Sequence, residues 1–177
     1  MTWRAPASGR TVDLAGLGAA SERQMLDGWL RWHREVLLAK CAGLEPAQLA
    51  RTTVEPSDLS LLGLVRHMTE IERWWFRRSF AGETLGDVFT GPEDGNEGLD
   101  GVEAEDAPEV FERFRAELVL CDAAAAGHGL DETFLTARGV LLSLRWVYVA
   151  MIQEYARHNG HADLLRERTD GATGDSG

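Results

Sequence analysis

The residues of this chain best suited to chemistry lie close together in the stretch Gln-Glu-Tyr-Ala-Arg-His-Asn-Gly-His, residues 153–161. If this stretch is helical, Glu154, His158 and His161 share one stripe, because residues three and four apart have Cβ atoms about 5 to 6 Å apart. Their side chains lean towards the preceding turn, so a carboxylate and an imidazole one turn apart can reach the same point. This spacing predicts a metal site.

A further ligand is expected from His67, which lies between apolar residues at helical spacing and is therefore predicted to face a core. Each imidazole taken alone could equally be a hydrogen-bonded core residue. Three convergent nitrogen and oxygen donors without a fourth protein ligand, however, are typical of an open, catalytic metal site. Because residues three apart also share a face, the spacing leaves open whether Glu154 or His161 is the ligand beside His158.

Four helices are predicted to position these residues, because apolar side chains recur in four segments with a period near 3.6. Ser21 and Gln24 form a capping box, and Asp106 followed by Pro108 is a second start signal. Gly82 predicts the end of the second helix. The predicted helices run from Ser21 to about Leu44, from about Ser57 to about Ala81, from Asp106 onwards, and from about Ser143 to Thr169.

The connection between the second and third helices, residues 82–110, contains ten acidic residues and no basic one. Such a segment is typical of a solvated surface connection, and its length allows it to cross a helical bundle from end to end. The sequence therefore predicts one all-α domain over residues 1–177, a four-helix bundle with a long acidic crossover loop. Residues 1–19 form an N-terminal extension, residues 127–142 a loop with an extended piece at 140–142, and residues 170–177 a flexible tail.

Composition narrows the class of function. The net charge of -11 and the pI near 4.9 argue against nucleic acid as a partner, because phosphate binding relies on clustered Lys and Arg. No apolar run has the length of a signal peptide or a membrane helix, so we expect a cytoplasmic protein without a membrane partner. Cys41 and Cys121 lie at apolar positions of helical patterns, which predicts reduced thiols that pack in the core.

Two segments resemble a known family. They run from Ser60 to Phe76, including Leu-Val-Arg-His and Glu-Arg-Trp-Trp-Phe, and from Ser143 to Gly174, including His-Asn-Gly-His at 158–161. Both are similar to the mini-circle protein branch of the DinB-like superfamily. In that superfamily a divalent metal is bound by a His of the second helix and by two residues one turn apart on the fourth helix. The second of these two begins a His-Arg-Gly-Gln motif.

The resemblance implies a role for each matching residue. His67 corresponds to the ligand on the second helix, His158 to the start of the motif, and Glu154 to the position four residues earlier. This set resembles the His, Glu and His ligands of mycothiol-dependent maleylpyruvate isomerases. The resemblance also implies that His161, which stands where the motif has Gln, contacts a metal-binding residue and does not bind the metal itself. Ala150 departs from the family pattern, because members of this branch often have His there, and the change alters the pocket.

The resemblance also implies a fold and an activity. The bundle would have up-down-down-up topology and bind one divalent metal ion, with zinc favoured and nickel also compatible with the ligands. Relatives are often dimers, so a homodimer is compatible with the resemblance. The implied activity is a metal-dependent transferase or isomerase that uses a low-molecular-weight thiol, such as mycothiol or bacillithiol, to attack a small electrophilic substrate.

Two alternatives from other classes remain open. One is a metal-dependent hydrolase that activates water, for which His33 is the candidate base. The other is a non-catalytic metalloprotein that binds a small molecule. A pocket lined by His33, Trp32 and Trp75, with Trp29 beside them, would serve any of these functions. The same aromatic residues could also be core residues of the bundle.

Overall fold

The computed structural model describes residues 2–9, 11–89, 99 and 102–173, and the described chain is mostly helical. A π-helix, η1, directly continues α4. The long helices are α2 (Glu22–Cys41), α4 (Leu61–Glu72) with η1 (Arg73–Phe80), α5 (Ala107–Ala125) and α6 (Leu144–Asp170). The shorter elements are α1 (Leu14–Leu17), α3 (Pro46–Leu49), η2 (Ala104–Asp106), β1 (Thr133–Leu135) and β2 (Leu141–Ser143).

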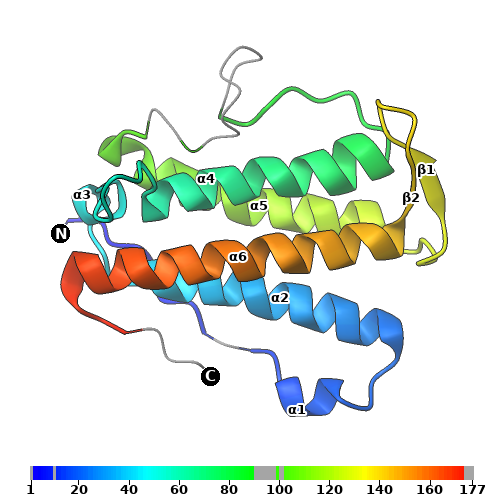
Figure 1. The fold of residues 1–177 in the computed structure, drawn as a ribbon, viewed down its shortest axis with the longest axis horizontal. Coiled ribbons are helices and arrows are strands. Elements are labelled where there is room, and N and C mark those ends of the chain that lie inside the picture. Colours follow the sequence, from blue (N-terminus) through cyan, green and yellow to red (C-terminus); the bar gives the residue numbers. More distant parts are fainter. Residues whose placement is uncertain (1, 10, 90–98, 100–101, 174–177) are drawn as a thin grey trace.

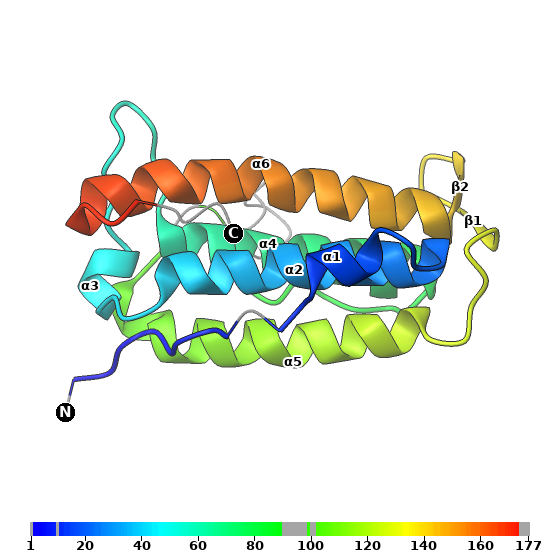
Figure 2. The ribbon, with the colours of Figure 1, turned by 90° about the horizontal axis from the view of Figure 1, so that it is seen from below.

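The long helices lie side by side along the longest axis of the molecule (Figures 1 and 2). α6 packs against both α2 and α4, and α5 packs against α4. The colours of Figure 1 show that α2 and α6 run in one direction and that α4 and α5 run in the other. The connection from η1 to η2 therefore returns along the length of the molecule. Residues 90–98 and 100–101, which carry much of the predicted acidic loop, lie outside the described residues.

The first long helix starts where the sequence predicted and ends earlier. The capping box of Ser21 is present, but α2 ends at Cys41 rather than at Leu44. Gly43 adopts a positive φ of 77°, which turns the chain out of the helix. The backbone after the turn pairs with the N-terminal extension, because the N–H of Ala5 donates to the carbonyl of Leu44 at 2.9 Å. Ala5 is buried, so the extension is part of the packed structure.

The second helix begins at Leu61 and not near Ser57. Ser60 has an extended backbone, and its hydroxyl accepts a hydrogen bond from the N–H of Gly63 at 3.0 Å, so Ser60 is the N-cap. The hydroxyl of Ser57 instead accepts from the N–H of Leu59 at 3.2 Å, a local turn that competes with helix formation. The predicted start was therefore wrong by one turn.

The predicted boundaries of the other two helices were partly correct. Asp106 is the N-cap of α5, as predicted, but its side chain makes no capping hydrogen bond and η2 leads directly into α5. Ser143 does cap α6. Asp170, predicted to belong to the tail, is the last residue of α6, and Gly171 follows with a positive φ of 81°. The end of the predicted tail, residues 174–177, lies outside the described residues.

A β-hairpin joins α5 to α6. The extended piece predicted at 140–142 is confirmed as β2, and β1, which the sequence did not predict, pairs with it in antiparallel register, Phe134 opposite Leu142. The hairpin lies at the end of the molecule where α4 and η1 finish (Figure 1).

A buried carboxylate joins three of the long helices. Glu72 of α4 has no exposed surface, and Arg34 of α2 donates hydrogen bonds to its two oxygens at 2.6 and 2.7 Å. The hydroxyl of Tyr155 on α6 donates to the same carboxylate at 2.9 Å. Burial raises the pKa of Tyr155 well above its ordinary value, so the hydroxyl remains a donor. This network fixes the positions of α2, α4 and α6 relative to one another.

Candidate metal centre

Two imidazoles and one carboxylate come together between α4 and α6. One ligand atom from each of His67, Glu154 and His158 lies within 4.8 Å of the other two. Nε2 of His158 is 3.5 Å from Oε2 of Glu154, and the ring centroids of His67 and His158 are 4.7 Å apart. The structure thus brings together the three residues that the sequence singled out.

The contact between α4 and α6 positions these side chains. Glu154 and His158 are four residues apart on α6 and therefore point to the same side of the helix. His67 reaches them only if α4 has the correct register against α6. The hydrogen bond from Tyr155 to Glu72 sets that register, because Tyr155 directly follows Glu154 on α6 and Glu72 lies five residues after His67 on α4.

His158 is electrically neutral near pH 7. Its side chain is 10% exposed, and burial, followed by the neighbouring His67, His161 and Arg157, lowers its pKa to about 4. A neutral imidazole keeps a nitrogen lone pair available, which is the form that binds a metal ion. The geometry and the protonation state of His158 therefore agree with a ligand role.

Glu154 is only partly buried. Its side chain is 26% exposed, and Nη1 of Arg157 lies 3.3 and 3.4 Å from its two oxygens. A carboxylate that is partly hydrated and paired with an arginine can stay ionised without a metal. The partial burial of Glu154 therefore does not by itself require a metal, whereas the meeting of the three donors favours one.

His161 contacts His158 without joining the group of three. Nδ1 of His161 is 3.4 Å from Nδ1 of His158, and their ring centroids are 5.3 Å apart. One of the two nitrogens must carry the proton in such a pair, so His161 can hold the orientation of the His158 ring.

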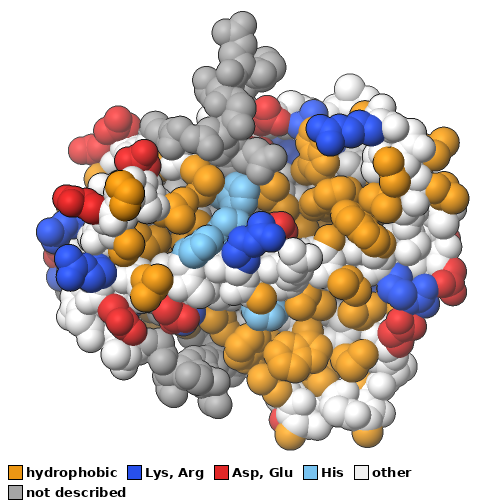
Figure 3. Space-filling view, viewed as in Figure 1, with side chains coloured by type: hydrophobic (Ala, Val, Ile, Leu, Met, Phe, Trp, Pro, Cys, Tyr) orange, Lys and Arg blue, Asp and Glu red, His pale blue; other side chains and the backbone are white. Residues whose placement is uncertain are grey.

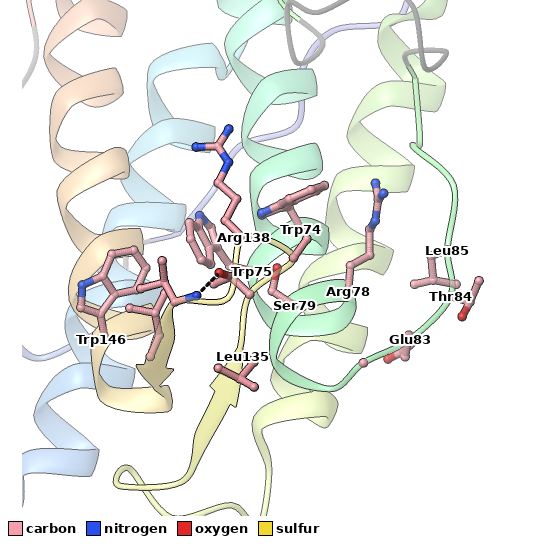
Figure 4. A pocket seen from close by; sticks show the side chains of 15 residues that line it. Trp74, Trp75, Arg78, Ser79, Glu83, Thr84, Leu85, Leu135, Arg138 and Trp146 are labelled. Atoms are coloured by element: carbon pink, nitrogen blue, oxygen red, sulfur yellow. Dashed lines mark hydrogen bonds between the residues drawn. The ribbon is translucent and has the colours of Figure 1, made fainter.

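The residues expected to line one pocket lie in two places. Trp32 and His33 are on α2, with ring centroids 4.9 Å apart, and Nδ1 of His33 is 3.3 Å from Nδ2 of Asn159. Trp75 is in η1, with its ring centroid 4.9 Å from that of Trp146, and it lines a separate pocket (Figure 4). Asn159 stands inside the His-Asn-Gly-His motif but was not among the predicted site residues.

The cluster opens to one face of the molecule. Figure 3 shows His side chains gathered at the surface where α4 and α6 meet, beside a Lys or Arg side chain and between areas of hydrophobic side chains. A small molecule can therefore approach the imidazoles from this face, although His67 and His158 are mostly buried.

The donor set fits a divalent metal ion. Ligand atoms bound to one tetrahedral zinc at about 2.0 to 2.2 Å lie roughly 3.4 Å apart, close to the 3.5 Å between His158 and Glu154. Two imidazoles and a carboxylate, without a thiolate, are a ligand set of catalytic zinc sites, which keep a fourth position open.

A model of the mycothiol-S-transferase family matches residues 25–171, a range that includes the whole cluster. The chain belongs to this family. Membership confirms the predicted place of the chain in the DinB-like superfamily. Searches among curated proteins and solved structures gave no match for this mycothiol-S-transferase family member. In the part of the chain that the structure describes, no helix is both long and apolar enough to cross a membrane.

Proposed function

We propose that this protein is a metal-dependent transferase that delivers the thiol of mycothiol to a small electrophile. Membership of the mycothiol-S-transferase family supports the choice of thiol. The observation that carries metal dependence is the meeting of His67, Glu154 and His158 within 4.8 Å. A divalent ion held there would lower the pKa of a coordinated thiol and so supply a thiolate near neutral pH. Zinc is favoured, and nickel fits the same ligands.

The side chains around this site would bind the metal and hold its ligands in position. The neutral His158 offers a nitrogen lone pair, and Arg157 holds the carboxylate of Glu154 in place from the solvent side. His161 would orient the His158 ring through the contact between their Nδ1 atoms. The opening on the face of Figure 3 gives the thiol and the electrophile a route to the same point.

The main rival is a hydrolase, in which water takes the place of the thiol. It needs a general base close to the metal. The candidate base His33 lies outside the group of three donors, and its Nδ1 is within 3.3 Å of the Asn159 amide. Burial lowers the pKa of His33, which weakens it as a base. These observations favour the transferase.

We further infer that the architecture is a single-domain four-helix bundle of up-down-down-up topology. The opposite directions of the pairs α2 with α6 and α4 with α5 support this topology (Figure 1). A homodimer and a cytoplasmic location belong to the same proposal, on the strength of the family resemblance.

The test compares four variants after zinc loading, with metal content measured by mass spectrometry and transfer measured with mycothiol and a panel of electrophiles. Glu154→Gln and His158→Ala should lose both metal and transfer. His161→Ala should retain metal with about 10- to 100-fold lower affinity, because it perturbs a ligand rather than removing one. His128→Ala is the matched control, since His128 is an exposed histidine paired with Glu132 and not part of the cluster.

Three outcomes would contradict the proposal. Product formed at full rate without thiol would favour the hydrolase. Metal retained by Glu154→Gln but lost by His161→Ala would exchange the roles of these two residues. A zinc-loaded protein that transfers mycothiol to none of the electrophiles would leave a metalloprotein that binds a small molecule.

A further inference from the structure

Two matching rows of residues lead from the metal cluster to a second site. Each row is spaced by four, so its members form one ridge of a helix. At one end the three donors meet within 4.8 Å, and at the other end two tryptophan rings meet at 4.9 Å. The rows are His67, Ile71 and Trp75 on α4 and η1, and Glu154, Ala150 and Trp146 on α6.

The second site is a pocket of about 800 Å³. It lies between η1, the residues that follow η1, the β-hairpin and the start of α6 (Figure 4). Trp74, Trp75 and Trp146 line it, and Trp74 and Trp146 are 44% and 41% exposed. Large aromatic side chains that stay exposed around a concave surface mark a binding site for an apolar ligand.

The pocket and the cluster are about two helical turns apart. Eight residues separate His67 from Trp75, and eight separate Glu154 from Trp146, which corresponds to about 12 Å at about 1.5 Å per residue. Midway between the two sites, the row on α6 carries the half-buried Ala150, whose side chain is a single methyl group. A ligand held by the tryptophans can therefore extend along this seam towards the metal cluster.

The pocket has one cation that nothing in the described structure neutralises. Arg78 is paired with Asp87 at 2.6 Å, and Glu83 is paired with an arginine at 2.6 Å. Arg138, in the hairpin turn, makes no hydrogen bond or ion pair with any residue that the structure describes. Figure 4 shows its side chain extending from the hairpin along the helices. The chain has 29 acidic and 18 basic residues, so acidic partners are not scarce.

We propose that this pocket binds the acceptor of the transfer reaction, and that the acceptor is a planar aromatic molecule with a carboxylate and, remote from it, an electrophilic double bond. Trp74, Trp75 and Trp146 offer ring faces and edges for stacking, and Arg138 offers a guanidinium for the carboxylate. In the reaction a C–S bond forms, the C=C π bond breaks, and the proton lost by the thiol ends on the neighbouring carbon. The reaction rests on the proposed function, whereas binding in the pocket does not.

Isothermal titration calorimetry with 2-naphthoate tests the binding directly. The probe is titrated into the purified protein before and after chelation, with neutral 2-naphthamide and non-aromatic cyclohexanecarboxylate as comparators. We expect one site whose affinity is unchanged by chelation and falls as salt is added. Both comparators should bind about tenfold more weakly than 2-naphthoate, because each lacks one of the two recognised groups.

Variants assign the two recognised groups to residues. Arg138→Gln should weaken 2-naphthoate about tenfold and leave 2-naphthamide unchanged, and Trp74→Leu should weaken both. Arg115→Gln is the matched control, because Arg115 is exposed on α5 and does not line the pocket. Circular dichroism confirms that each variant is folded.

Several results would overturn this assignment. Unchanged 2-naphthoate binding by Arg138→Gln would remove the carboxylate contact. Binding lost on chelation would place the carboxylate on a metal, and displacement by mycothiol would make the pocket the site of the thiol. Binding that weakens as the chain self-associates would make the pocket an interface between copies. Binding as expected, in a protein that transfers no thiol, would support the pocket and reject only the proposed function.

Discussion

Replacing Arg34 with methionine should destabilise the fold mainly through the charge that it leaves behind. The change removes the guanidinium that donates to both oxygens of Glu72, at 2.6 and 2.7 Å, and keeps an apolar stem of similar length. Glu72 has no exposed surface, so its carboxylate remains in the core. The hydroxyl of Tyr155, at 2.9 Å, is then its remaining donor among the described residues.

A carboxylate that stays in the core after its partner is removed sets the size of the effect. Leaving one partner of a buried ion pair charged and alone costs about 3 to 5 kcal/mol. Glu72 keeps the hydrogen bond from Tyr155, so we expect Arg34→Met to lower the free energy of unfolding by about 3 to 4 kcal/mol at pH 7.

Urea unfolding of the metal-free protein at pH 7, followed by far-UV circular dichroism, measures this loss relative to the unsubstituted chain. The double variant Arg34→Met with Glu72→Leu is the matched control, because it removes both charges and should recover most of the stability at pH 7. A loss below about 1 kcal/mol, or a double variant no more stable than Arg34→Met, would show that the stranded carboxylate does not set the cost.

Four further results are expected. In the same urea assay Tyr155→Phe should cost about 2 kcal/mol, because it removes a hydrogen bond to an ionised carboxylate. In protein that is kept at a free metal concentration of roughly a hundred times Kd, chelation should lower the free energy of unfolding by about 2.7 kcal/mol. Loss of the helical signal at 25 °C on chelation would contradict this. Cys41 and Cys121 should react with a thiol reagent only after unfolding, since burial raises the pKa of Cys41 to about 12 and that of Cys121 further. Burial lowers the pKa of His33 and that of His158, the latter to about 4, so at mildly acidic pH the unfolded chain binds protons that the folded chain does not. Thermal melts of the metal-free protein should therefore show stability falling as the pH drops from about 6.5 towards 4. His158→Gln should reduce this fall.

Local sequence was sufficient to predict the features that depend on near neighbours in the chain. The cap at Ser21 and the start of the last helix near Ser143 were predicted, because a serine hydroxyl satisfies amide groups only two or three residues away. Glu154 and His158 share one side of α6 whatever the helix packs against, because the spacing of four alone sets this relation. The residues that resemble the DinB-like superfamily are equally local, and they predicted the family correctly.

Which of these residues meet, and how exposed they are, depends on how the helices pack against one another. His67 joins the other two donors through the register of α4 against α6, which the bond from Tyr155 to Glu72 fixes across 83 positions of sequence. No pattern within a single helix predicts a contact such as that between Tyr155 and Glu72. The pocket lined by Trp74, Trp75 and Trp146 likewise needs η1 and the β-hairpin. The sequence predicted neither a π-helix at η1 nor the strand β1. The physical reason is that caps and spacing follow from backbone hydrogen bonds within a turn or two, whereas burial, pairing and cavities depend on which surface of another element covers a side chain.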